Sequence, residues 1–127
     1  MRGLTVTVLI SLALILGIGL FSGNYSHFIS EEMQGQTELL TQRIASGEWT
    51  EAEKMAEEMA HAWKRRGDVL SMWVNHADVD DVSAGLEKLQ VSIRARETFY
   101  SQLCAAELRE ALDHVYHRDS LRLKNIL

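Results

Sequence analysis

The sequence contains no proline, and only eight of its 127 residues are glycine. Proline and glycine form most of the turns in all-β folds and in long loops, so their scarcity argues against both kinds of structure. Alanine, leucine, glutamate and arginine are abundant instead, and these residues favour helix because they lose little conformational freedom there. The composition therefore predicts an all-α chain, and its length suits one domain.

Disulfides and a strong positive charge are also missing. The single cysteine, Cys104, cannot close an intramolecular disulfide, and its place among apolar residues at helical spacing favours a buried, unreactive thiol. The formal net charge is −5, and an acidic chain is repelled by nucleic acid. The short basic run Lys64-Arg65-Arg66 is typical of a solvated helix face, so we expect no nucleic-acid binding.

Charge is absent from a long stretch near the N-terminus, where Leu, Ile and Val dominate. Residues 4–21 would form a helix of about 27 Å at about 1.5 Å per residue, which nearly spans a hydrocarbon core of about 30 Å. Arg2 precedes this stretch and Glu31 and Glu32 follow it, and the positive end of a span stays in the cytoplasm. We therefore predict a transmembrane signal-anchor over residues 1–23, in contact with membrane lipid through residues 4–21.

A cleaved signal peptide is the alternative interpretation, because small residues such as Gly17 and Gly19 near the end of the stretch could form a processing site. Leu20 and Phe21 crowd the positions that such a site needs, and no A-x-A pattern is present. No cysteine follows the apolar run, which excludes a lipoprotein anchor. A retained span is the prediction, with the N-terminus in the cytoplasm and the rest of the chain outside the cell membrane.

Two helices are expected next. Residues 24–47 have apolar residues near helical spacing and predict a juxtamembrane helix that ends at Gly47, a left-handed cap. Thr50 and Glu53 have the spacing of a capping box and predict the start of the following helix. The apolar face of that helix includes Trp63, Trp73 and Gly67, and the glycine permits a close approach of backbones.

A second apolar series then begins, with steps of three and four residues as in a coiled coil. Asp78 directly precedes the series and is the expected N-cap, and with His76 it would form the turn between the two helices. No helix-breaking residue follows Leu86, so one long helix or two nearly collinear helices are predicted. Packing of the apolar faces predicts an N-terminal transmembrane helix followed by an antiparallel helical hairpin or three-helix bundle over residues 48–127. The series is Val79, Val82, Leu86, Leu89 and Ile93.

Two groups of residues could hold a metal ion. Glu110, His114 and His117 fall at i, i+4 and i+7 and could give zinc three ligands, but the H-E-x-x-H arrangement is absent. Solvated polar residues near a helix end are the preferred interpretation. His76 and the aspartates that follow it form an acidic turn without the ligand spacing of a calcium loop. We therefore predict no metal, no cofactor and no catalytic residue.

Several segments of the chain form a recognisable set when they are taken together. They are the N-terminal span, Gly47-Glu48-Trp49-Thr50-Glu51-Ala52, Trp63 with Trp73 ten residues later, His76-Ala77-Asp78-Val79-Asp80-Asp81-Val82 and Leu121-Arg122-Leu123-Lys124-Asn125-Ile126-Leu127. In these segments the chain resembles an uncharacterised domain-of-unknown-function family of small membrane-anchored proteins from Gram-positive, often spore-forming, bacteria. The resemblance covers nearly the whole chain and implies the same topology with an extracytoplasmic helical domain, but no reaction.

The motif residues are accordingly candidates for structural roles, in which Asn125 would cap or clamp the last helix. For function, the sequence favours a non-enzymatic interaction or scaffold module on the outer face of the cytoplasmic membrane, with a protein partner. A domain that binds or senses a metal or small ligand is the alternative. Convergence of His76, His114 and His117 in one pocket would favour the ligand, and outward, dispersed histidines would favour the scaffold. The structural candidates are Trp63, Trp73, His76, Asp78 and Asn125.

Overall fold

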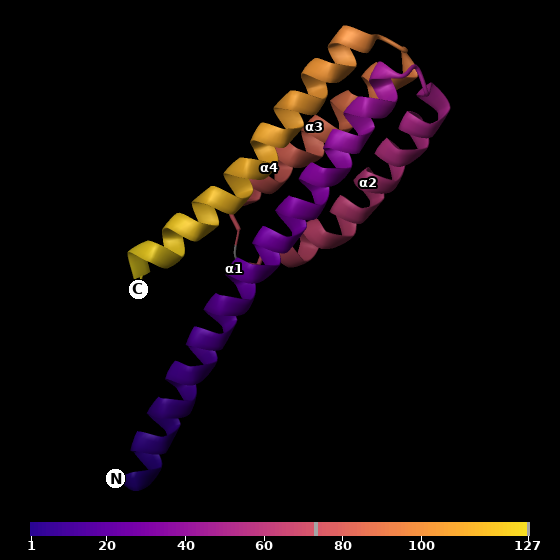
Figure 1. Cartoon of the computed structure of the whole chain (residues 1–127). Helices are drawn as coiled ribbons and strands as arrows, with labels where there is room; N and C mark the ends of the chain where they lie inside the picture. The colour runs from indigo at the N-terminus through magenta and orange to yellow at the C-terminus, as the bar shows by residue number, and fades with distance from the viewer. Residues whose placement is uncertain (73, 127) are drawn as a thin grey trace.

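The computed structural model describes the backbone of residues 1–72 and 74–126, and the side chains of these residues except 22, 23 and 118–126. Four helices follow one another in this part of the chain (Figure 1). The all-helical prediction is thereby confirmed. The helices are α1 (Arg2–Ala45), α2 (Trp49–Leu70), α3 (His76–Arg94) and α4 (Thr98–Ile126).

Helix α1 is 44 residues long and runs without a break from the apolar N-terminal stretch into the polar stretch after it. Its N-terminal half extends alone beyond the other three helices (Figure 1), and the side chains from Leu4 to Phe21 are almost all exposed. The hydroxyls of Thr5, Thr7 and Ser11 donate to carbonyls four residues back, which satisfies them within an apolar segment. By length and composition, α1 is the one helix of the described chain that could cross a membrane.

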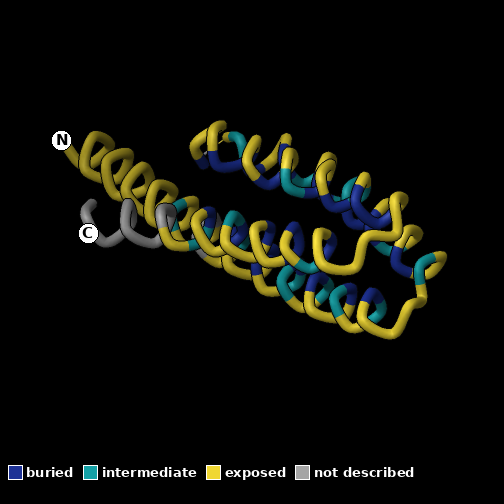
Figure 2. Tube along the Cα trace, turned by 90° about the horizontal axis from the view of Figure 1, so that it is seen from above, coloured by how far each residue is buried: buried dark blue, intermediate teal, exposed yellow. Residues whose placement is uncertain are grey.

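The second half of α1 packs with the other helices around one core. Helix α1 contacts α2 and α4, and α3 contacts the same two helices. The buried residues of all four therefore face one another (Figure 2). We expected two or three helices in this core, and the described structure has four, because the second half of α1 contributes buried side chains of its own. Those of α1 include Ile29, Met33, Leu40 and Ile44, whereas the apolar side chain of Phe28 is exposed.

The α1–α2 connection reverses the chain at Gly47, which has a φ of +75° as the left-handed cap predicted. The predicted capping box is wrong. Helix α2 begins at Trp49, and Glu48 is its N-cap without a side-chain hydrogen bond. The backbone N–H of Glu48 donates to the Arg43 carbonyl at 3.0 Å, so the turn closes early and Thr50 already lies inside the first helical turn.

The α2–α3 connection shows that the predicted N-cap at Asp78 is wrong. The N-cap of α3 is Asn75, whose side-chain oxygen accepts from the backbone N–H of Ala77 at 3.0 Å. The helix starts three residues before the position that Asp78 would require as a cap. Asp78 instead lies in the first turn of α3 with its side chain buried.

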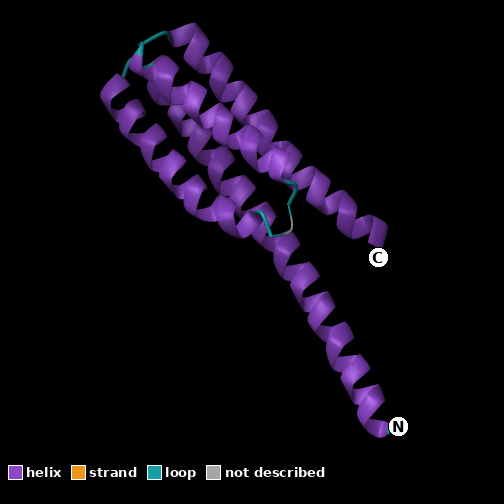
Figure 3. Cartoon of the chain, turned by 180° about the vertical axis from the view of Figure 1, so that it is seen from behind, coloured by secondary structure: helices purple, strands orange, loops and turns teal. Residues whose placement is uncertain are grey.

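The α3–α4 connection, residues 95–97, contradicts the prediction of one long or two collinear helices. The chain turns back at Arg96, which has a φ of +54°, so that α4 packs beside α3 (Figure 3). The backbone N–H of Glu97 donates to the Ser92 carbonyl at 3.3 Å and closes the turn. A turn that depends on a left-handed conformation at an arginine cannot be predicted from the residue type.

Candidate functional site

Trp63 joins two helices. Its side chain is 2% exposed, and its indole N–H donates to the Ser83 hydroxyl at 3.1 Å and to the Val79 carbonyl at 3.3 Å. The Ser83 hydroxyl in turn donates to the Val79 carbonyl at 3.1 Å. Trp63 therefore links α2 to α3 through packing and through a shared polar contact.

The other motif residues have different environments. His76 is the first residue of α3 and is exposed, whereas Asp78, two residues later, is 3% exposed. The carboxylate of Asp78 therefore belongs to the interior of the bundle rather than to the surface of the turn. Trp73 and the side chain of Asn125 lie outside the described residues.

The residues considered for zinc do not come together as a ligand set. Glu110, His114 and His117 are all exposed on α4, and Nδ1 of His117 lies 3.4 Å from Oδ1 of Asp113 rather than near Glu110. Among the described residues, no group of three or more His, Cys, Asp or Glu side chains could hold a metal ion. Cys104 is buried in the core of the bundle.

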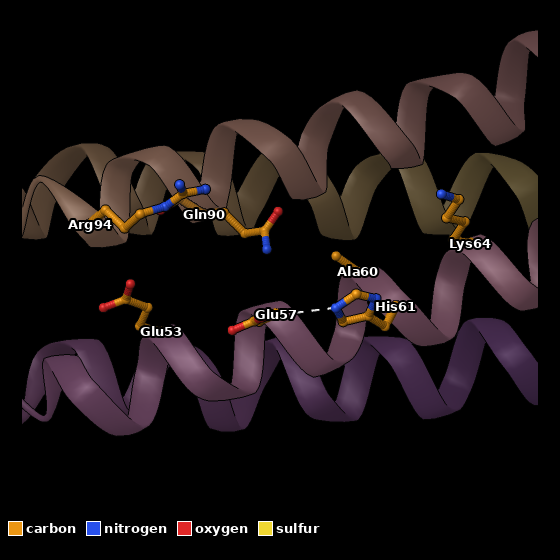
Figure 4. A pocket seen from close by; sticks show the side chains of 7 residues that line it. All are labelled: Glu53, Glu57, Ala60, His61, Lys64, Gln90 and Arg94. Atoms are coloured by element: carbon orange, nitrogen blue, oxygen red, sulfur yellow. Dashed lines mark hydrogen bonds and ion pairs between the residues drawn. The ribbon is translucent and has the colours of Figure 1, made fainter.

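A groove lies between α2 and α3. It consists of two overlapping spaces of about 390 and 450 Å³. The buried side chains of Trp63 and Leu86 line the second space, and the small side chain of Ala60 lines both. Charged and polar side chains line both spaces, and Figure 4 shows those around Ala60 in the first space. They are Glu53, Glu57, His61 and Lys64 of α2 and Ser83, Glu87, Gln90 and Arg94 of α3.

The groove arises from side chains of unequal size along α2. Near the C-terminal end of α2, Gly67 lies so close to α3 that an added Cβ would come within 3.3 Å of a Val79 methyl carbon. Toward the N-terminal end, Ala60 presents only a methyl group, so space stays open between the two helices. The close contact at one end and the small side chains at the other leave the groove open to solvent.

Charges of both signs line the groove without meeting across it. The Glu57 carboxylate lies 3.8 Å from Nε2 of His61 on its own helix, and Nε of Arg94 donates to the Gln90 carbonyl at 3.4 Å. No ion pair crosses the groove between the described residues of α2 and α3 that line it. Glu53 and Arg94 lie on opposite walls of the groove (Figure 4). Both walls therefore present charged side chains with which a bound group could form ion pairs.

This groove is not predicted from the sequence, although the spacing of charged residues gives a signal for it. On α2, Glu53, Glu57, His61 and Lys64 are separated by four, four and three residues, which puts them on one helix face. The same spacing on α3 joins Glu87, Gln90 and Arg94. The sequence alone does not reveal that these two faces are neighbours in the folded chain.

The arrangement suits recognition by charge and shape. A cationic group could pair with the carboxylates of Glu53 and Glu57, and an anionic group with the guanidinium of Arg94. The hydroxyl of Ser83 is already engaged by Trp63 and Val79. The groove therefore offers hydrogen bonds and ion pairs above an apolar floor.

Comparison with known proteins identifies one family. The model of a domain of unknown function (DUF4363) matches residues 20–126 of the chain, which include most of the described bundle. This match confirms the expected resemblance to an uncharacterised family. No curated protein and no solved structure matches the chain.

Proposed function

For this chain, which belongs to the DUF4363 family of domains of unknown function, we propose a membrane-tethered, non-enzymatic interaction module on the outer face of the cytoplasmic membrane. A protein partner would bind in the groove between α2 and α3. The observation that carries this proposal is the groove itself, an open and charged surface on a bundle whose exposed apolar helix extends away from it.

The exposed half of α1 supports the anchor. Its apolar side chains are almost all exposed, and leaving so many of them in water would be costly. Arg2 precedes the apolar stretch, and the acidic residues Glu31 and Glu32 follow it, which favours a cytoplasmic N-terminus and an outer bundle. A cleaved signal peptide is the competing explanation of the same stretch.

The chemistry of the groove supports an interaction with another protein. Three carboxylates and two cations line it without pairing across it, and charges of both signs match a polypeptide that carries both signs. The exposed histidines His76, His114 and His117 form no described metal group, and dispersed histidines favour a scaffold over a metal site.

A small-ligand sensor is the second candidate. Each of the two overlapping spaces has a volume within the range of about 300–1,000 Å³ that is usual for small-molecule sites, and Trp63 lies at the floor. Such sites usually bury most of their ligand, whereas this groove is open along its length. The openness favours a polypeptide over a small molecule.

A photocross-linking amino acid at position 90 tests the proposal in the full chain in its native membrane. Gln90 lines the groove, and Lys88, two residues away on the outer side of α3, is the matched control. We expect a protein adduct from position 90 and none from position 88. Absence of an adduct from a chain that is found in the membrane would contradict a protein partner in the groove.

The topology has its own test. A phosphatase reporter that is active only outside the cytoplasm, fused to the C-terminal end, should be active while the fusion sediments with membranes. An intact domain free in the medium would mean that the span is a cleaved signal.

A further inference from the structure

We propose that the end of the bundle that carries the α2–α3 turn rests in the lipid headgroup layer, where the side chains of Phe28, Val69 and Met72 contact lipid. We call these three residues the lipid-facing patch. The inference depends on the membrane anchor proposed above and adds to it a second, peripheral contact with the same membrane.

The spacing of charges along α1 sets the depth of the bundle. Between Arg2 and Glu31 the sequence has no Asp, Glu, Lys or Arg. This stretch of helix is about 42 Å long at about 1.5 Å per residue, and a bilayer with its headgroups is about 40–45 Å thick. The apolar part ends at Phe21, so Ser26, which is buried in the bundle, lies about 7 Å beyond the hydrocarbon core. The bundle therefore begins within the headgroup layer.

One face of α1 carries aromatic side chains through this layer. Phe21, Tyr25, Phe28 and Glu32 are at i, i+4, i+7 and i+11, and therefore lie on one side of the helix. The rings of Phe21 and Tyr25 are stacked with their centroids 5.8 Å apart. Glu32 lies 2.8 Å from a guanidinium nitrogen of Arg66, so this side of α1 faces α2.

The same ion pair fixes the level of α2. Met72 is six residues beyond Arg66 on an antiparallel helix, so it lies about 9 Å closer to the membrane than Glu32 does. That places Met72 about 7–8 Å from the level of Phe21, again within the headgroup layer. The α2–α3 connection accordingly lies beside the middle of α1 (Figure 1). Met72 is 80% exposed, and Val69, three residues earlier, is exposed as well.

The opposite side of α1 has a different character at this level. His27 packs against Tyr116 of α4, with ring centroids 4.5 Å apart, and its Nε2 lies 3.5 Å from Glu31. Asp80 and Asp81 are exposed on α3. The exposed apolar side chains of the patch thus lie on α1 and α2, where Glu31 and Asp68 are also exposed, and α3 presents Asp80 and Asp81. A tilt of the bundle toward α1 and α2 brings the patch to lipid and moves Asp80 and Asp81 away from lipid phosphates.

Fluorophore labelling at single cysteines tests the inference in the full chain. Met72→Cys carries the dye in the patch, and Phe99→Cys is the matched control, because Phe99 is 79% exposed at the other end of the bundle. The native Cys104 is buried, so the wild-type chain measures background labelling. Each chain is reconstituted in vesicles of phosphatidylethanolamine and phosphatidylglycerol, with and without lipid that carries a nitroxide near the headgroup.

We expect the nitroxide lipid to quench the dye at position 72 on the order of twofold or more, and the dye at position 99 not at all. Equal quenching at the two positions, in chains that float with the vesicles and keep their helical circular dichroism, would overturn the inference and leave the anchor intact. Chains that fail to float would overturn the anchor and the inference with it.

Discussion

Replacing Gly67 by alanine should fail to stabilise the chain, although the same change at an open helical position should stabilise it. Inside a helix, alanine is favoured over glycine by roughly 0.8–1.0 kcal/mol. At Gly67 this gain meets a steric cost, because the new Cβ would come within 3.3 Å of a methyl carbon of Val79, closer than the usual carbon–carbon separation of about 3.5–4.0 Å.

The neighbourhood of Gly67 cannot relax cheaply. The Val79 side chain has a strongly preferred rotamer in a helix, so relief requires α2 and α3 to separate. Separation stretches the bonds from the Trp63 indole to Ser83 and to Val79, which are already 3.1 and 3.3 Å long. Overpacking of this kind costs about 1–3 kcal/mol. The free energy of unfolding of Gly67→Ala should therefore lie between the wild-type value and a value about 2 kcal/mol lower.

Two other glycines serve as controls. An added Cβ at Gly35 would meet nothing within 4 Å, so Gly35→Ala should stabilise by about 0.8–1.0 kcal/mol. At Gly85 the nearest atom is the flexible end of Leu108 at 3.4 Å, so Gly85→Ala should behave more like Gly35→Ala. The assay is thermal unfolding of the full chain in lipid nanodiscs, followed by circular dichroism. A difference of 1 kcal/mol shifts the midpoint of a domain of this size by about 4–8 °C.

The double variant Gly67→Ala with Val79→Ala removes the methyl carbon that the new Cβ would touch. It should therefore show a favourable coupling on the order of 1 kcal/mol relative to the sum of the single changes. If Gly67→Ala raises the midpoint as much as Gly35→Ala does, the close approach of α2 and α3 at this position is refuted, and with it our account of why the groove opens at the other end.

The connections offer two further predictions, both measured by unfolding of the full chain. Asn75→Ala should cost about 0.5–2 kcal/mol because it removes the cap of α3, while Asn75→Asp should cost far less, since aspartate caps as well; equal losses would argue against the cap. Arg96→Gly should stabilise the chain by about 0.5–1 kcal/mol. The left-handed backbone costs a residue other than glycine roughly 1–2 kcal/mol, and glycine avoids this cost. Part of the gain is lost because glycine also gives the unfolded chain more conformational entropy. A loss of stability in Arg96→Gly would contradict the left-handed turn.

Local chemistry explains what could be predicted from the sequence. The absence of proline and the periodic apolar residues were enough to indicate helices throughout. The turn at Gly47 was predictable because glycine is the residue that adopts a left-handed cap without strain. The apolar stretch before Phe21 could also be predicted, because a run of residues without charge can be identified from the sequence without knowing which helices lie beside it.

The tertiary structure alone decided which faces meet. The segment around Ile29 and Ile44 belongs to the core because α2 and α4 cover it. The groove exists because Glu57 and Gln90, far apart in the sequence, lie on opposite walls of one space. Neither fact follows from the spacing of residues along a single helix, since each depends on the partner that the helix packs against.

The reversal at Arg96 shows the physical reason most clearly. Locally, a continuous helix through residues 95–97 would be favoured, because the left-handed backbone of Arg96 costs roughly 1–2 kcal/mol. A continuous helix would carry the buried face of α4 away from the bundle, including Leu108 and Leu112, which have no exposed surface. Burial of each such side chain contributes about 1.5–3 kcal/mol. The sum over the face exceeds the local cost, so the core, and not the local sequence, determines where the chain turns.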